Sequence, residues 1–145
     1  MAILAMGGEG GGVLADWCVD MAERNGFWAQ TTSVPGVAQR TGTTVYYLEF
    51  FPKLAGESKE PVLSTMAAPG EVDIVVASEL MEAGRAVQRG FVAPTVTTFI
   101  TSTHRVYSMA EKMALGDGRV DSEVLLDAAK KAAKVLIPAD FAKVA

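Results

Sequence analysis

Two short stretches carry the residue types that could bind a ligand. The first is a glycine cluster, GGEGGG, at residues 7–12, between an apolar run and an amphipathic segment. Glycines at a strand-to-helix turn let the backbone approach a ligand, and the amides of a helix N-terminus favour an anion. Two interpretations stay open: contact with a phosphate or cofactor, or tight packing of the helix against the strand. The glycines concerned are Gly8, Gly10, Gly11 and Gly12.

The cluster matches no nucleotide-binding fingerprint completely. A relaxed dinucleotide pattern would use Gly10, Gly12 and Ala15, but AQTTS, in the second predicted strand, lacks the acid that would hold the ribose. The Gly-Lys-Ser/Thr sequence of a P-loop is absent. Glu9 places a carboxylate among the amides, which disfavours an anion there.

The second stretch is the loop VPGVAQRTG, residues 34–42, between two predicted strands. Arg40 stands beside Gln39 and is followed by Gly42. An arginine in this setting can grip a carboxylate, a phosphate or an acidic partner surface with two parallel hydrogen bonds. The alternative is a solvated loop arginine, which composition alone favours because connecting loops are usually exposed.

Other candidates are weaker. His104 and Arg105 follow a predicted strand, where α/β sheets often place ligands, but a lone histidine without a nucleophile is more often structural. GDG at residues 116–118 resembles the start of a thiamine diphosphate motif, yet the only asparagine of the chain, Asn25, lies far upstream. A turn between two helices is the better interpretation of GDG. Cys18 lies on an apolar helix face and is expected in the core.

The elements that must position these residues alternate along the chain. Periodicity predicts strands at 1–6, 27–33, 43–51, 72–78 and 95–101, and helices at 12–24, 79–90, around 104–114 and at 122–136. A further short edge strand could lie at 62–65. We expect one domain, residues 1–145, built as a three-layer α/β/α sandwich with a mostly parallel (mixed), Rossmann-like sheet.

Some local features are specific enough to test. Ser78 is expected to cap its helix, and Gly84 inside that helix indicates close packing or a kink. Leu136 belongs to the apolar stripe of the last helix, which Pro138 should end. The apolar face of the first helix comprises Val13, Leu14, Trp17, Cys18 and Met21.

Composition excludes several classes of protein. The chain has 145 residues, half of them hydrophobic, and a net charge of −4, so no basic surface attracts nucleic acid. No apolar run approaches the ~18 residues of a membrane span. Because Cys18 is the only cysteine, an internal disulfide and a cysteine-ligated metal or iron–sulfur site are ruled out, and a cytoplasmic location fits best.

Four blocks, taken together in order, resemble a known family. MGGEGGGVLADW, TTSVPGVAQRTG, VASELMEAGRA and STHRVYSMAEK are similar to successive signatures of the γ-type domain of 2-oxoacid:ferredoxin oxidoreductases. The likeness is greatest to the β subunit of indolepyruvate:ferredoxin oxidoreductase and spans nearly the whole chain. Such enzymes decarboxylate a 2-oxo acid on thiamine diphosphate, pass electrons through iron–sulfur clusters to ferredoxin, and release an acyl-CoA.

The resemblance implies a division of labour. Thiamine diphosphate and the clusters reside on other domains, so this chain alone is expected to bind neither and to need a thiamine- and iron–sulfur-bearing subunit of the same complex. The γ-type domain is thought to help close the active site or to receive CoA. Gln39, Arg40 and Gly42 match a signature near the domain interface, which makes them candidates for interface or substrate-side residues, with none assigned as catalytic.

The chain also departs from the family. The family usually has Gln where this chain has Glu9, which weakens anion binding at the glycine loop. The family's domain normally continues beyond the last helix, so either an excised fragment or a short subunit is expected. An incomplete fold would leave apolar faces uncovered.

Overall fold

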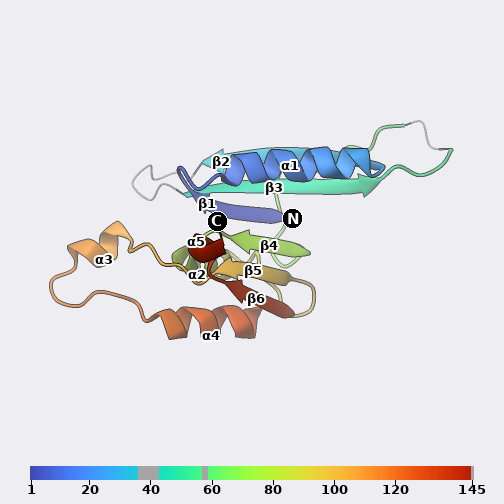
Figure 1. Cartoon of the computed structure of the whole chain (residues 1–145). Helices are drawn as coiled ribbons and strands as arrows, with labels where there is room; N and C mark the ends of the chain where they lie inside the picture. The colour runs from blue at the N-terminus through green and yellow to red at the C-terminus, as the bar shows by residue number, and fades with distance from the viewer. Residues whose placement is uncertain (36–42, 57–58, 145) are drawn as a thin grey trace.

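Six strands form one mixed sheet in the order β2-β3-β1-β4-β5-β6 (Figure 1). The computed structural model describes residues 1–35, 43–56 and 59–144. The strands are β1 (Ala2–Met6), β2 (Phe27–Pro35), β3 (Thr43–Pro52), β4 (Ile74–Ala77), β5 (Thr98–Ser102) and β6 (Val135–Ala139). The helices are α1 (Gly11–Arg24), α2 (Leu80–Gln88), α3 (Met109–Met113), α4 (Ser122–Ala132) and α5 (Phe141–Val144).

The sheet has a parallel half and an antiparallel half. β1, β4, β5 and β6 run parallel, with Leu4 beside Ala77 and Ile100 beside Ile137. β3 pairs antiparallel with β1 and with β2. β1, β4 and β5 therefore end at the same edge, where β3 begins, and we call this the carboxyl edge of the sheet. Parallel α/β sheets place ligands outside this edge.

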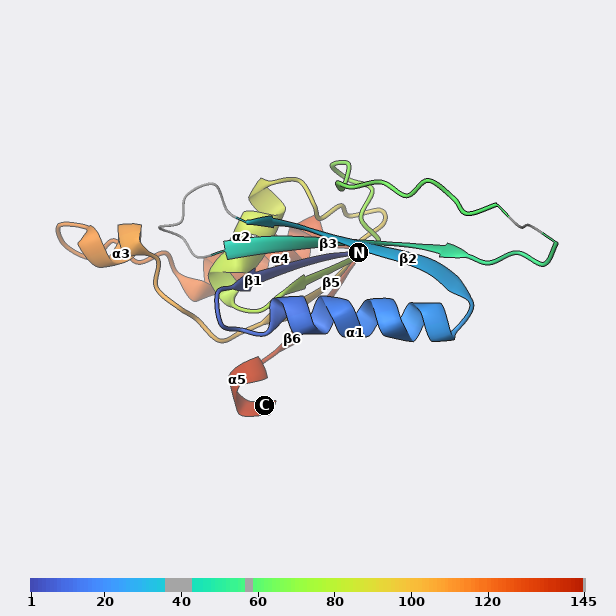
Figure 2. The ribbon, with the colours of Figure 1, turned by 90° about the horizontal axis from the view of Figure 1, so that it is seen from above.

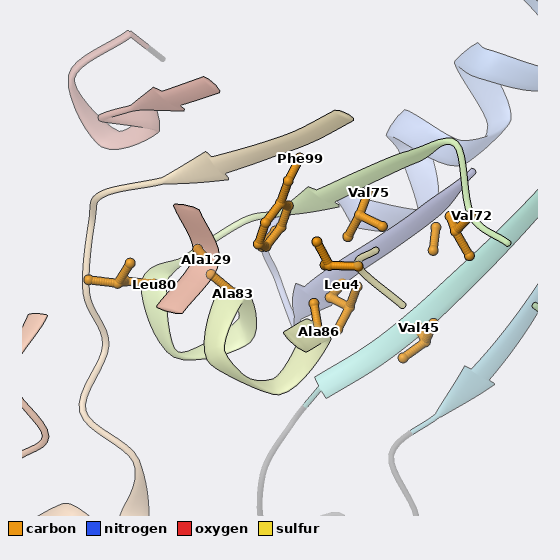
Figure 3. Packing of buried hydrophobic residues seen from close by; sticks show 12 residues of the cluster. Leu4, Val45, Val72, Val75, Leu80, Ala83, Ala86, Phe99 and Ala129 are labelled. Carbon is orange, nitrogen blue, oxygen red and sulfur yellow. The ribbon is translucent and has the colours of Figure 1, made fainter. Parts of the chain in front are cut away.

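The main core lies between the sheet and the helices α2 and α4. Leu4, Val75 and Phe99 from three parallel strands point toward Ala83 and Ala86 of α2 (Figure 3). The small residues of α2 let it lie close to its neighbours. A Cβ at Gly84 would lie 2.9 Å from Cδ2 of Leu125 on α4, so the close packing predicted for this glycine is confirmed.

On the opposite face, α1 covers the antiparallel half of the sheet (Figure 1). Gly11, Ala15 and Ala22 are its buried residues, because only small side chains fit where the helix meets the strands. The predicted apolar face therefore lies on the flank of the helix. Cys18, expected in the core, is only half-buried at its margin, and Trp17 stays 69% exposed. The exposed members of that face are Val13, Leu14, Trp17 and Met21.

Beside this flank, the parallel half of the sheet carries exposed apolar side chains. Ile74, Val135 and Ile137 are 38–46% exposed on the same side as α1. A groove of about 450 Å³ lies beside α1, lined by Ile74, Cys18 and Met21 among others. None of the helices in the described part of the chain has the length and apolarity needed to cross a membrane.

The α/β sandwich is confirmed, and two predicted elements are corrected. The last helix ends at Ala132, and Leu136 and Pro138 belong to strand β6 instead. Proline is tolerated there because β6 is an edge strand, whose outer amides need no partner. The helix predicted around 104–114 is shortened to α3, because residues 103–107, which follow β5, have no regular secondary structure.

The short edge strand considered at 62–65 does not form. Residues 62–64 have no regular secondary structure and Thr65 lies in a bend. Side chains from β2 hold the segment instead: Gln30 Nε2 donates to the Ser64 carbonyl (3.1 Å) and Thr32 Oγ1 to the Thr65 carbonyl (2.7 Å).

Candidate functional site

The carboxyl edge gathers polar side chains from segments far apart in the sequence. The glycine loop after β1, the turn after β4 and the segment after β5 all leave the sheet there, and α3 projects beyond it (Figure 2). Thr43, the first residue of β3, lies opposite Met6 at the end of β1. The candidate site is therefore built from backbone turns and from the first turn of α2.

The glycine loop is shaped by two separate requirements. Gly8 and Gly10 have φ of 89° and 74°, a left-handed conformation that favours glycine. Gly11 has an ordinary φ, but a Cβ there would lie 2.5 Å from Cβ of Ala5 and 2.8 Å from Cε2 of Tyr46. A Cβ added at Gly12 would lie 3.5 Å from the Tyr46 ring, which is an ordinary contact distance. Close packing thus accounts for Gly11, while ligand contact at the loop stays a prediction.

Glu9 fastens the loop to the sheet. Its Oε2 accepts a hydrogen bond from the Met6 amide (2.9 Å) and another from the Ser78 hydroxyl at the end of β4. The loop thereby holds a carboxylate of its own near the start of α1, where Gly10 provides no side-chain cap. An added anion would meet this negative charge.

Glu79 caps α2 in place of Ser78, which corrects the sequence prediction. The buried Glu79 carboxylate accepts hydrogen bonds from the amides of Met81 (2.8 Å) and Glu82 (2.7 Å), and from Val106 (3.3 Å) in the segment after β5. Burial raises the pKa of Glu79 and outweighs the lowering by these hydrogen bonds. Glu79 thus joins two of the segments that form the edge.

Glu82 forms a second buried cluster one turn later. Its Oε1 accepts a 2.7 Å hydrogen bond from Thr43 Oγ1 and forms an ion pair with Nη1 of Arg85. The same Nη1 donates a 2.7 Å hydrogen bond to Thr43 Oγ1. Within the described residues, Oε2 of Glu82 is buried without a hydrogen-bond partner. The cluster fixes Thr43, the first residue of β3, against α2.

The Arg105 side chain has a structural role, because it is mostly buried and joins separate segments of the chain. Its Nη1 donates to Ser122 Oγ (3.1 Å) and to the Val120 carbonyl, and its Nη2 pairs with Glu111. The side chains of Arg105 and Glu111 are only 9% and 4% exposed. Burial would raise the pKa of Glu111, but hydrogen bonds from the Ser108 and Val120 amides, with the Arg105 charge, lower it.

GDG lies in the connection between α3 and α4, as predicted, with Gly116 in a bend rather than a regular turn. Asp117 is exposed, and its carboxylate accepts two hydrogen bonds of 2.8 Å from Nε and Nη2 of Arg119. These bonds lower the pKa of Asp117 to about 2. A carboxylate engaged this way, at an exposed turn, does not match a ligand for the metal of a bound diphosphate.

The remaining predicted residues are not all placed. Gln39, Arg40 and Gly42 lie outside the described residues, so their roles stay predictions. His104 is exposed, and its carbonyl accepts a 2.9 Å hydrogen bond from the Leu80 amide. Sequence reasoning missed Glu79 and Glu82. Two acids three residues apart, opening a helix directly after a buried strand, were the available signal.

Comparison with known proteins identifies the family of the chain. The family model described as "pyruvate ferredoxin/flavodoxin oxidoreductase" matches residues 1–145. The chain belongs to this family. It is therefore a component of an oxidoreductase complex that uses thiamine diphosphate and iron–sulfur clusters. A search of curated proteins finds no match.

The residues of this family member do not fit those groups. An iron–sulfur cluster needs about four thiolates, and the chain has one cysteine, half-buried against the sheet. Among the described residues, no group of three or more metal-ligating side chains comes together. We therefore derive no reaction step on this chain through either group.

Proposed function

We propose that the chain is the γ-type part of a 2-oxoacid:ferredoxin oxidoreductase. The reaction would be the oxidative decarboxylation of an aryl 2-oxo acid, with indolepyruvate as the first candidate, to an acyl-CoA, with the electrons passed to ferredoxin. The family match over residues 1–145 carries this proposal, and the four sequence blocks favour the γ type within the family.

The chain is inactive alone in this proposal. A thiamine- and cluster-bearing subunit supplies the groups that cleave the carbon–carbon bond and accept the electrons. This chain contributes its carboxyl edge, which helps close the active site or receive CoA. The complex is placed in the cytoplasm, where its reduced clusters would persist.

Gln39, Arg40 and Gly42 are proposed as residues on the partner or substrate side. The support is indirect: they precede Thr43, which the Glu82–Arg85 cluster holds at the carboxyl edge. Gly8, Gly10, Gly11 and Gly12 are proposed to lie along the same surface, with Gly11 also needed for packing.

Reconstitution tests the proposal. The chain is mixed with a thiamine- and cluster-bearing subunit of such a complex. Reduction of a viologen dye is then followed with CoA and either indolepyruvate or pyruvate. We expect activity only with both proteins, and a higher kcat/KM for indolepyruvate than for pyruvate. If omission of this chain leaves the activity unchanged, the proposal fails. If pyruvate is the better substrate, the aryl specificity fails.

A second candidate function rests on the strand–glycine–helix unit formed by β1 and α1. This unit is the usual beginning of a nucleotide-binding domain, so the chain could instead be a stand-alone nucleotide- or CoA-binding module. Calorimetric titration of the isolated chain with NAD, FAD and CoA separates the two. Micromolar binding would favour the module, whereas the first proposal predicts no heat without the partner.

A purely structural subunit is the third candidate. In that case Arg40 grips an acidic surface of the partner, and the Arg40→Ala variant should assemble more weakly while the residual complex keeps its kcat. Equal assembly with a lower kcat would place Arg40 on the substrate side instead.

A further inference from the structure

An arm of the chain leaves the body between β5 and α4. Residues 105–120, which we call the α3 arm, project past the carboxyl edge in two perpendicular views (Figures 1 and 2). The long connection between β3 and β4 projects from the opposite end of the sheet (Figure 2). The arm therefore extends from the edge that the proposed function assigns to the partner.

The base of the arm is held by buried polar contacts. Arg105 at its start reaches across to Val120 at its end and to Ser122, the first residue of α4. The Glu111 carboxylate forms an ion pair with Arg105 and also accepts a 3.0 Å hydrogen bond from the Val120 amide. Both ends of the arm are thus tied together, and the arm is preorganised.

α3 is stabilised within the arm by its own cap. Ser108 Oγ accepts from the Glu111 amide (3.3 Å), and Glu111 Oε2 accepts from the Ser108 amide (2.8 Å), which is a complete capping box. The only charge pair at the turn beyond α3, Asp117 with Arg119 among the described residues, is satisfied internally. The charges of Asp117 and Arg119 are therefore already paired within the arm.

The tip of the arm is apolar and bare. Met113 is 74% exposed and Leu115 is fully exposed. Arg105 anchors the base of the arm, and the tip is the part of the arm farthest from this anchor. The side chains of the tip therefore do not fold back onto the core. Apolar side chains exposed in this way mark surfaces that bind another protein, and Met is enriched at such interfaces.

We propose that the α3 arm docks the chain onto the thiamine-bearing subunit, with Met113 and Leu115 inserted into an apolar pocket of that subunit. This inference rests on the proposed function and adds the surface that makes the contact. A second copy is a poorer occupant, because two chains of charge −4 repel each other. A copy would also have to receive the tip in its groove beside α1, and such a head-to-tail contact need not close into a pair.

The test uses two matched double variants. M113S/L115S removes the apolar tip, and V62S/M66S makes equivalent changes in the connection between β3 and β4, where Val62 is 99% and Met66 65% exposed. All four side chains are exposed, so both variants should keep the wild-type Tm within a few degrees. Calorimetry then measures the Kd of each for the thiamine-bearing subunit.

We expect M113S/L115S to raise Kd at least about tenfold and V62S/M66S to change it less than about twofold. If wild-type chain binds and M113S/L115S binds equally well, the arm is not the docking element and the inference is overturned. If the wild-type chain does not bind, the proposed function fails first. Sedimentation of the isolated chain tests the second copy. If the chain self-associates and M113S/L115S abolishes this association, a second copy is the occupant and the inference is also overturned.

Discussion

Alanine at two adjacent glycines of the same helix should have opposite effects on stability. Gly11 and Gly12 both begin α1, and in either position alanine favours the helix by up to ~1 kcal/mol. At Gly11 the new Cβ would lie 2.5 Å from Cβ of Ala5, more than 1 Å inside the ~3.5–4.0 Å optimum for two carbons. The neighbour is a strand residue that cannot rotate away, since Ala5 has no flexible side chain and is buried.

The magnitude follows from these two terms. Overpacking of this kind costs ~1–3 kcal/mol, so Gly11→Ala should lower the free energy of unfolding by about 1–2 kcal/mol after the helix gain. Gly12→Ala meets Tyr46 at an ordinary 3.5 Å and should raise stability by about 0.5–1 kcal/mol. For a chain of this size the Tm should fall by about 3–8 °C in the first variant and rise by about 2–4 °C in the second.

The assay is thermal unfolding by circular dichroism, repeated with urea to give the free energy directly. Equal stability of the two variants would refute the reasoning, because it would mean that α1 does not approach β1 as closely as the structure has it. A loss at Gly12 with no loss at Gly11 would refute it more strongly, since that order reverses the two distances.

Three further perturbations test other parts of the structure. Glu82→Ala should cost about 2–3 kcal/mol, because it removes a buried carboxylate that pairs with Arg85 and Thr43. Asp127→Ala, which breaks an exposed pair, should cost less than about 0.5 kcal/mol; urea unfolding compares the two variants, and equal losses would contradict the buried cluster. Because the pKa of Glu111 is lowered, its contribution to the free energy of unfolding is present above its ordinary pKa of 4.5 and is lost as pH falls through the folded pKa. Glu111→Gln should therefore flatten the decline in Tm between pH 6 and pH 3, and an unchanged slope would argue against this role. Gly84→Ala should change stability by less than about 1 kcal/mol, because the atom it meets is the flexible end of Leu125, and a loss above 2 kcal/mol would show that α2 and α4 cannot adjust.

Much of the fold was predictable because local patterns and the tertiary structure agree. Alternating strand and helix signals gave the α/β sandwich, and Gly84 correctly indicated a close helix contact. The segment around Leu136 was misassigned because a short apolar run beside a good helix former has no distinguishing period. Only its pairing with β5, a contact distant in sequence, makes it a strand.

The orientation of α1 shows a limit of amphipathic analysis. Its apolar residues do lie on one side, but small residues decide which side meets the sheet. Ala15 and Ala22 allow close approach, so Trp17 remains exposed although it is the largest apolar residue of the helix. Hydrophobicity alone ranks these residues in the opposite order.

The candidate site was the least predictable part of the molecule. Glu79 and Glu82 read as ordinary helix acids, and their burial depends on segments that meet only in the folded chain, such as Thr43 and Val106. Arg105 was singled out for its place after a strand, but its partner Glu111 could not be foreseen from spacing alone. The residues predicted for the partner side, Gln39 and Arg40, still depend on the family resemblance.

The most direct test of the central claim is a titration of this chain into its thiamine-bearing partner. The rate of indolepyruvate-dependent viologen reduction is measured at a fixed partner concentration as the chain is added. A saturable rise from a negligible rate, reaching its plateau at a fixed stoichiometry, is the predicted result. A rate that stays level throughout the titration, whether high or negligible, would contradict the claim that this chain completes the enzyme.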